Sequence, residues 1–138
     1  MRGVSFSFLL VAGMMLAGAS ARADTAGGVP STMTRLDNGD LVYHHICAAC
    51  HMADGKGARG AGAKYPALAG DQKLAIAAYP TMMVLNGHGG MPWFAGILTD
   101  RQIADVVTYI RSHLGNHWTD AVTPEQVREM RQPITLEE

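Results

Sequence analysis

Apolar residues recur at helical spacing near the carboxyl-terminal end of the chain. The repeat consists of Ile103, Val106, Val107, Ile110 and Leu114. This spacing puts all of its members on one face of a helix. Thr99 and Gln102 form a capping box at the start of this helix, and Gly115 is expected to end it in the left-handed conformation.

Weaker signals predict shorter helices elsewhere. A first helix is expected to begin near Asp37 or Asn38, because either side chain can accept from the free amides of a helix start. Further helices are expected after Asp71, from Pro80 to Gly87, and from Thr123 to a point before Pro133. Residues 54–63 are expected to form a glycine-rich loop. Because no segment alternates well enough to predict a strand, the predicted fold class is all-α.

The first residues resemble a secretory signal peptide. Arg2 precedes an uncharged, mostly apolar run that ends in Ala21-Arg22-Ala23, a site with small residues at both ends. This pattern predicts cleavage before Asp24 and export to the periplasm, with no stable membrane span afterwards. An uncleaved membrane anchor is the alternative.

Composition excludes several classes of protein. The 138 residues carry a formal charge of −1, which argues against a nucleic-acid binder. The composition, with 17% charged and 48% hydrophobic residues, argues against a disordered chain. Two cysteines cannot build a disulfide-rich scaffold. After signal cleavage Phe94 is the one phenylalanine left, so something other than large side chains is expected to fill the core.

The two cysteines lie in Cys47-Ala48-Ala49-Cys50-His51, the C-x-x-C-H pattern of covalent haem attachment. Two thiols at this spacing near a helix end can each form a thioether with one porphyrin vinyl group. The adjacent His51 can then bind the iron through Nε2. Three alternatives are a Cys47–Cys50 disulfide, a thioredoxin-like dithiol, and a zinc site that includes His44 and His45. The disulfide leaves His51 unexplained, the dithiol lacks a βαβ pattern, and the zinc site lacks a distant ligand pair.

Haem iron can bind a second side chain opposite His51, and the methionines are the candidates for this second axial ligand. Met52 is tethered beside His51, Met82 and Met83 lie within a predicted helix, and Met33 and Met130 are expected outside the compact region. Met91 lies between glycines and a proline, in Gly87-His88-Gly89-Gly90-Met91-Pro92, where the backbone can approach a flat cofactor. Met91 is therefore the predicted ligand, with His88 or an open site as alternatives.

An iron with both axial positions filled by side chains has no place for oxygen, peroxide or substrate. The sequence therefore predicts a one-electron carrier and not an enzyme. The alternative is a haem-based sensor or a peroxidase-like protein, in which Met91 leaves the iron and the sixth position opens.

The chain resembles class I monohaem cytochromes c. The resemblance is carried by the segment from Gly39 to His51, by residues 52–57 leading to Tyr65-Pro66-Ala67-Leu68, and by the segment from Gly89-Gly90-Met91-Pro92 to Asn116. It implies three to five helices around one covalently bound haem c. It also implies that the Pro66 carbonyl accepts from His51 and that Leu68 packs on the haem. Gly39 is expected where the amino-terminal helix of the shared core crosses its carboxyl-terminal helix, which precedes the extension.

Within this family the sequence is most similar to small cytochrome subunits of bacterial periplasmic dehydrogenases. The resemblance implies a dehydrogenase as electron donor and a terminal oxidase or another cytochrome as acceptor. The expected organisation is a signal peptide (1–23), a flexible lead-in (24–35), a cytochrome c domain (36–118) and a carboxyl-terminal helical extension (119–138). The charged residues of the extension, Glu125, Arg128, Glu129 and Arg131, are expected on a solvated helix face or at a partner interface.

Overall fold

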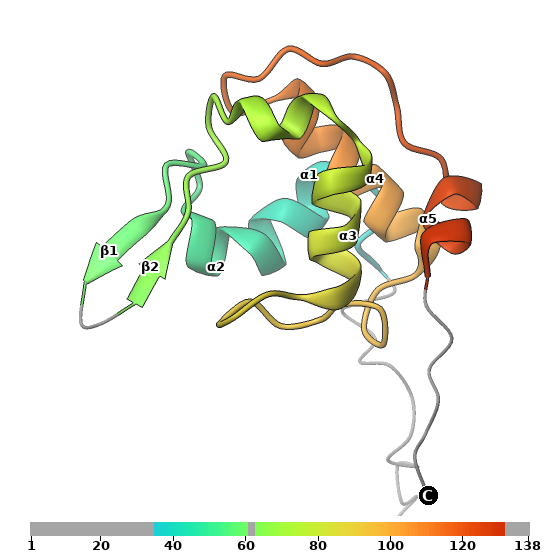
Figure 1. Ribbon diagram of the computed structural model, residues 1–138, viewed down its shortest axis with the longest axis horizontal. Helices are drawn as coiled ribbons and strands as arrows, with labels where there is room; N and C mark the ends of the chain where they lie inside the picture. Colours follow the sequence, from blue (N-terminus) through green and yellow to red (C-terminus); the bar gives the residue numbers. More distant parts are fainter. Residues whose placement is uncertain (1–34, 61–62, 132–138) are drawn as a thin grey trace, which may run out of the picture.

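The computed structural model describes residues 35–60 and 63–131, which fold mainly into helices (Figure 1). The elements in chain order are α1 (Gly39–Val42), η2 (Tyr43–Cys47), α2 (Ala48–His51), β1 (Ala58–Gly60), β2 (Ala63–Tyr65), η3 (Gln72–Ala75), α3 (Ala78–Asn86), α4 (Asp100–Ser112) and α5 (Pro124–Met130). The all-α fold class is confirmed. The predicted signal peptide, Met33 and residues 132–138 of the extension lie outside the described residues.

The first helix begins as predicted. The Asn38 side chain accepts a hydrogen bond from the Leu41 amide at 2.9 Å, so Asn38 is the amino-terminal cap. The elements α1, η2 and α2 then follow one another without a break. The middle element is a π-helical segment, a local widening that is often found at functional sites.

The helix α4 packs across α1 at Gly39. A β-carbon added at Gly39 would lie 2.1 Å from the Asp105 carbonyl oxygen and 2.8 Å from the Tyr109 β-carbon, so only glycine allows this approach. The rings of Tyr43 and Tyr109 lie across the same contact with centroids 5.5 Å apart. The predicted apolar face of α4 is buried from Ile103 to Ile110, and its capping box is formed. The expected helix crossing at Gly39 is therefore confirmed.

Three local expectations are wrong. Residues 58–60 and 63–65 form two antiparallel paired strands, β1 and β2, inside and beyond the expected loop. Alternation could not reveal strands of three residues. The helix α4 ends at Ser112, before Leu114, because the backbone of His113 is already extended. Gly115 has the predicted left-handed conformation, with a φ of 77°, but it lies beyond the helix end. The helix α3 begins at Ala78, before Pro80, which still lies in the first turn where its missing N–H is harmless.

The extension packs against the rest of the domain. The helix α5 begins at the predicted position, where Thr123 forms a capping box with Gln126, and Val127 is completely buried. Met130 packs against the core, so the expectation that it lies outside the compact region is wrong. Glu125, Arg128 and Glu129 are exposed, as expected for a solvated face.

A fully buried arginine joins α4 to the short helix η3. Arg111 donates to the carbonyl oxygens of Leu74 at 2.8 Å and Ala75 at 3.1 Å, and it forms an ion pair with Asp120 at 2.8 Å. The hydrogen bond from Arg111 lowers the pKa of Asp120. These contacts satisfy the guanidinium and fix the segment that leads into α3. Across residues 35–60 and 63–131, no helix is long and apolar enough to span a membrane.

Candidate functional site

Both cysteines and the histidine of the C-x-x-C-H motif lie at the end of the first helical run. Cys47 ends η2, and Cys50 and His51 are the last two residues of α2. The two thiols are free and partly buried. Burial raises the pKa of Cys47 to about 12, and the neighbouring Cys50 contributes to the rise. Before any haem is attached, the Cys47 side chain is therefore a protonated thiol at neutral pH.

His51 is held by the backbone at Pro66. The ring nitrogen Nδ1 lies 2.9 Å from the Pro66 carbonyl oxygen, and the residue is only 9% exposed. A carbonyl oxygen can only accept, so Nδ1 donates in this contact, and in the neutral ring Nε2 keeps its lone pair. An imidazole in this tautomer can bind a metal through Nε2. The contact expected between His51 and Pro66 is present in the structure.

Glycines bring the Pro66 segment close to His51. The Gly57 amide donates to the His51 carbonyl at 3.0 Å, and a β-carbon at Gly57 would lie 2.7 Å from the Pro66 carbonyl oxygen. Gly57 has a φ of 66°, which also favours glycine. The Leu68 amide donates to the Gly55 carbonyl at 2.7 Å. The loop after His51 thus carries the carbonyl that orients its ring.

Sequence reasoning gave Asn116 no role, although it lies at the end of the segments that carry the resemblance. Its Nδ2 donates to the Leu68 carbonyl at 2.9 Å and to the Ile110 carbonyl at 2.7 Å. Its Oδ1 is buried and has no hydrogen-bond partner among the described residues. Asn116 thus ties the backbone of Leu68 to the end of α4. The partly buried Leu68 side chain also packs against the core.

Met91 lies in a tight loop after α3. The backbones of His88 and Met91 exchange two hydrogen bonds, of 3.1 and 3.0 Å, across Gly89 and Gly90. A β-carbon at Gly87 would lie 2.5 Å from the Met91 carbonyl oxygen, so this turn lies directly on the end of α3. In the view of Figure 1 the loop extends from α3 toward the end of the molecule that carries α2.

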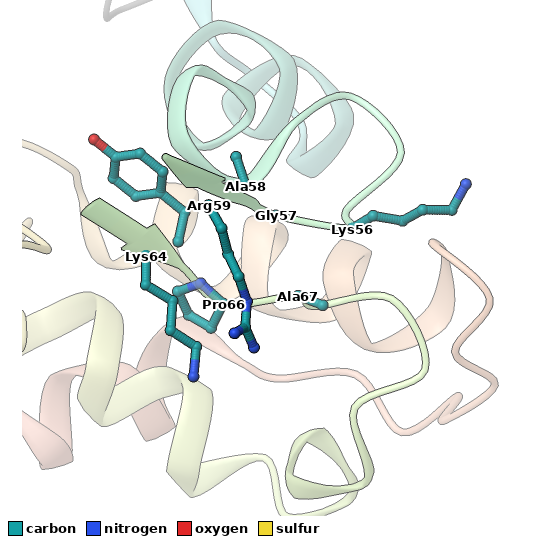
Figure 2. Close-up of a pocket in the computed structure, with 8 residues that line it drawn as sticks. Lys56, Gly57, Ala58, Arg59, Lys64, Pro66 and Ala67 are labelled. Atoms are coloured by element: carbon teal, nitrogen blue, oxygen red, sulfur yellow. The ribbon is translucent and has the colours of Figure 1, made fainter. Parts of the chain in front are cut away.

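A pocket of about 330 Å³ lies beside Pro66 (Figure 2). Its lining includes the basic side chains of Lys56, Arg59 and Lys64. Arg59 and Lys64 are direct partners across the β1–β2 ladder, where like charges repel. Lys56 pairs with Asp54 at 3.0 Å, whereas neither Arg59 nor Lys64 has a side-chain partner among the described residues. This side of the molecule is therefore locally positive.

The family model of cytochrome c oxidase, cbb3-type, subunit III matches residues 34–110. The chain belongs to this family of cytochrome c domains. It is therefore a cytochrome c electron carrier, and its single C-x-x-C-H motif implies one covalent haem c.

Two kinds of relative are similar to this cytochrome. It is 32% identical to the fructose dehydrogenase cytochrome subunit of Gluconobacter japonicus and 33% identical to the alcohol dehydrogenase (quinone) cytochrome c subunit of Gluconobacter oxydans (strain 621H). These alignments cover 73% and 67% of this chain but only 23% and 22% of the relatives. The cytochrome c6 of Leptolyngbya boryana is 37% identical over 58% of this chain and 94% of its own length. This cytochrome therefore spans about a quarter of the dehydrogenase subunits.

The residues at the motif fit haem c. Two free thiols and an imidazole with Nε2 available are the donors that covalent attachment and iron ligation require. The described residues contain no group of three or more His, Cys, Asp or Glu side chains arranged to hold a metal ion, so they do not form the cage expected for the zinc alternative. His44 instead lies near Asp40 and Tyr109, and His113 stacks on Tyr109.

Proposed function

We propose that this cytochrome carries single electrons with His51 and Met91 as the two axial ligands of its haem iron and with Cys47 and Cys50 as the attachment points. The observation that carries the proposal is the 2.9 Å contact between His51 Nδ1 and the Pro66 carbonyl, which leaves Nε2 for the iron. When bound, haem c supplies an iron that alternates between the ferrous and ferric states.

The chain's own residues restrict what the iron can do. The Pro66 carbonyl fixes the orientation and tautomer of His51, and Gly57 keeps that carbonyl in place. Met91 is fixed by its paired hydrogen bonds to His88 and by its contact with Gly87. Leu68 is the proposed packing residue against the porphyrin. With an imidazole and a thioether as ligands, the iron has no open position, which suits electron transfer.

Substitution of Met91 tests the ligand assignment. Ferric iron bound to a thioether has a sulfur–iron charge-transfer band, so Met91→Ala should abolish this band and lower the reduction potential. Met82→Ala is the matched control, because Met82 is 47% exposed on α3 and should leave both properties unchanged. A band that survives in Met91→Ala would refute the assignment. Rapid binding of carbon monoxide to the reduced wild-type protein would favour the sensor or peroxidase-like alternative instead.

We also propose that the electron donor is a periplasmic dehydrogenase and that the acceptor is a terminal oxidase or another cytochrome. The support is the similarity to cytochrome subunits of fructose and alcohol dehydrogenases. Ferric cytochrome added to an extract of the native cell should be reduced after addition of fructose or ethanol. Reduction by neither would count against a donor of the relatives' kind.

Residues 1–23 are proposed as the cleaved signal peptide that directs the chain to the periplasm. Residues 36–118 are proposed as the cytochrome c domain and residues 119–138 as its extension. Amino-terminal sequencing of the mature red protein should begin at Asp24. A mature protein that still begins at Met1 would refute cleavage and favour the anchor.

A further inference from the structure

Arg131 follows α5 and turns back onto the loop that joins Met91 to α4. Its Nη1 donates to the Ala95 carbonyl, and its Nε and Nη2 donate to Asp100 Oδ1 at 2.9 and 2.6 Å. Its Nη2 also lies 3.5 Å from the Leu98 carbonyl oxygen. The side chain is only 24% exposed. One guanidinium therefore joins the end of α5, the loop and the first residue of α4.

The opposite side of the same loop is fixed to α3. The amides of Phe94 and Ala95 donate to the carbonyls of Val84 and Leu85 at 2.9 and 3.3 Å. Between Met91 and α4 the chain has no helix or strand of its own, so these contacts, together with the packing of Phe94 and Leu98 on the core, determine where it lies. Ala95 receives both kinds of contact, with its amide on α3 and its carbonyl on Arg131.

We infer that Arg131 is a positioning residue for Met91, because it closes the methionine loop against α3 from the side of the extension. The inference rests on the proposed ligation by Met91. The family match ends at residue 110, so α5 and Arg131 lie beyond the matched segment. The charged residues of the extension thus divide into an exposed set, which includes Arg128, and a residue that acts inward on the loop.

The choice of side chain follows from the geometry of the acceptors. A guanidinium has five N–H donors in a fixed plane and can serve the Ala95 carbonyl and the Asp100 carboxylate together. A lysine ammonium keeps the charge but concentrates its donors at one nitrogen. Arg131→Lys can therefore keep the attraction to Asp100 while losing the contact with the loop, and it separates charge from positioning.

The experiment compares Arg131→Gln, Arg131→Lys and the exposed control Arg128→Gln in the full-length holoprotein. In Arg131→Gln the Phe94 and Ala95 amides should exchange hydrogen about tenfold faster than in wild type, as expected for loss of a charge-assisted hydrogen bond. The charge-transfer band should also disappear at a lower denaturant concentration than the far-ultraviolet circular dichroism. Arg131→Lys should recover only part of both effects, and Arg128→Gln should match wild type.

Unchanged exchange at Phe94 and Ala95 in Arg131→Gln would overturn the inference. So would acceleration that matches every other slow amide, because that pattern means simple loss of global stability. A wild-type protein that lacks the band refutes the proposed ligation by Met91 and, with it, this inference. A wild-type band with no difference between Arg131→Gln and Arg128→Gln refutes the inference alone.

Discussion

Replacing Gly39 with alanine tests whether contact between α1 and α4 organises the domain. The new β-carbon would lie 2.1 Å from the Asp105 carbonyl oxygen and 2.6 Å from its carbonyl carbon. Both atoms belong to the backbone of α4, so rotation of a side chain cannot relieve the clash. The two helices must separate by at least about 1.3 Å before the contact becomes ordinary.

The structure sets the size and the sign of the effect. A gap of about 1 Å already removes about half of the dispersion energy between the facing atoms, and overpacking a close contact costs about 1–3 kcal/mol. Alanine favours a helix over glycine by about 1 kcal/mol, which opposes the loss. With the loss of dispersion energy included, we expect the free energy of unfolding to fall by about 1–2 kcal/mol. Helix propensity alone predicts the opposite sign, so the experiment separates the two effects.

The assay is guanidinium denaturation of the holoprotein, followed by far-ultraviolet circular dichroism. Asp40→Ala is the control, because Asp40 is the next residue on α1 but its side chain is 58% exposed. That variant should stay within about 0.5 kcal/mol of wild type. A Gly39→Ala protein as stable as wild type, or more stable, would refute the close-contact argument.

Two further predictions concern charge. Burial raises the pKa of Tyr43 to about 12 from an ordinary 10.0, so the stability that its neutral hydroxyl contributes is complete below pH 10 and is lost as the pH rises toward 12. Tyr43→Phe loses the 2.7 Å hydrogen bond to the Met52 carbonyl, which should lower the free energy of unfolding by about 1 kcal/mol at pH 7. The variant should also flatten the pH dependence of unfolding between pH 10 and 12. A slope as steep as that of wild type would exclude Tyr43 as the source of this pH dependence. Oxidation of the reduced cytochrome by hexacyanoferrate(III) at low ionic strength should be slowed more by Lys64→Glu than by Arg128→Glu. Lys64 is on β2, which lies near α2, whereas Arg128 is on α5 at the other end of the molecule (Figure 1). The difference should vanish in 1 M salt. Equal effects of the two variants would contradict a positive patch beside the haem.

The sequence predicted those elements whose signals are local. The Thr99 capping box and the Asn38 cap depend on residues three positions apart, and both are formed. The apolar repeat of α4 is likewise a local signal, and its face is buried. The C-x-x-C-H motif also acts through adjacent residues, which explains why cofactor chemistry was accessible without a structure.

What the sequence could not predict depends on contacts between distant segments. Arg111 looks like any helix-surface arginine until the carbonyls of η3 and Asp120 surround it. Arg131 is similar, since its partners at Ala95 and Asp100 are more than thirty residues away. Leu114 has a left-handed conformation that glycine usually adopts, and its side chain lies against Gly55. Tertiary packing outweighs local preference at such positions.

The π-helical segment at Tyr43–Cys47 has a consequence for length variation in this chain. Each residue turns an α-helix by about 100°, so one residue lost or gained there would rotate the CAACH pentapeptide relative to the Gly39 crossing. The helical run contacts α4 at its start and carries the haem-attachment motif at its end, and the widened turn sets the angle between these two sites. Single-residue deletions within the segment should therefore be far less tolerated than substitutions, because no change of side-chain rotamer can restore the orientation of the motif relative to Gly39.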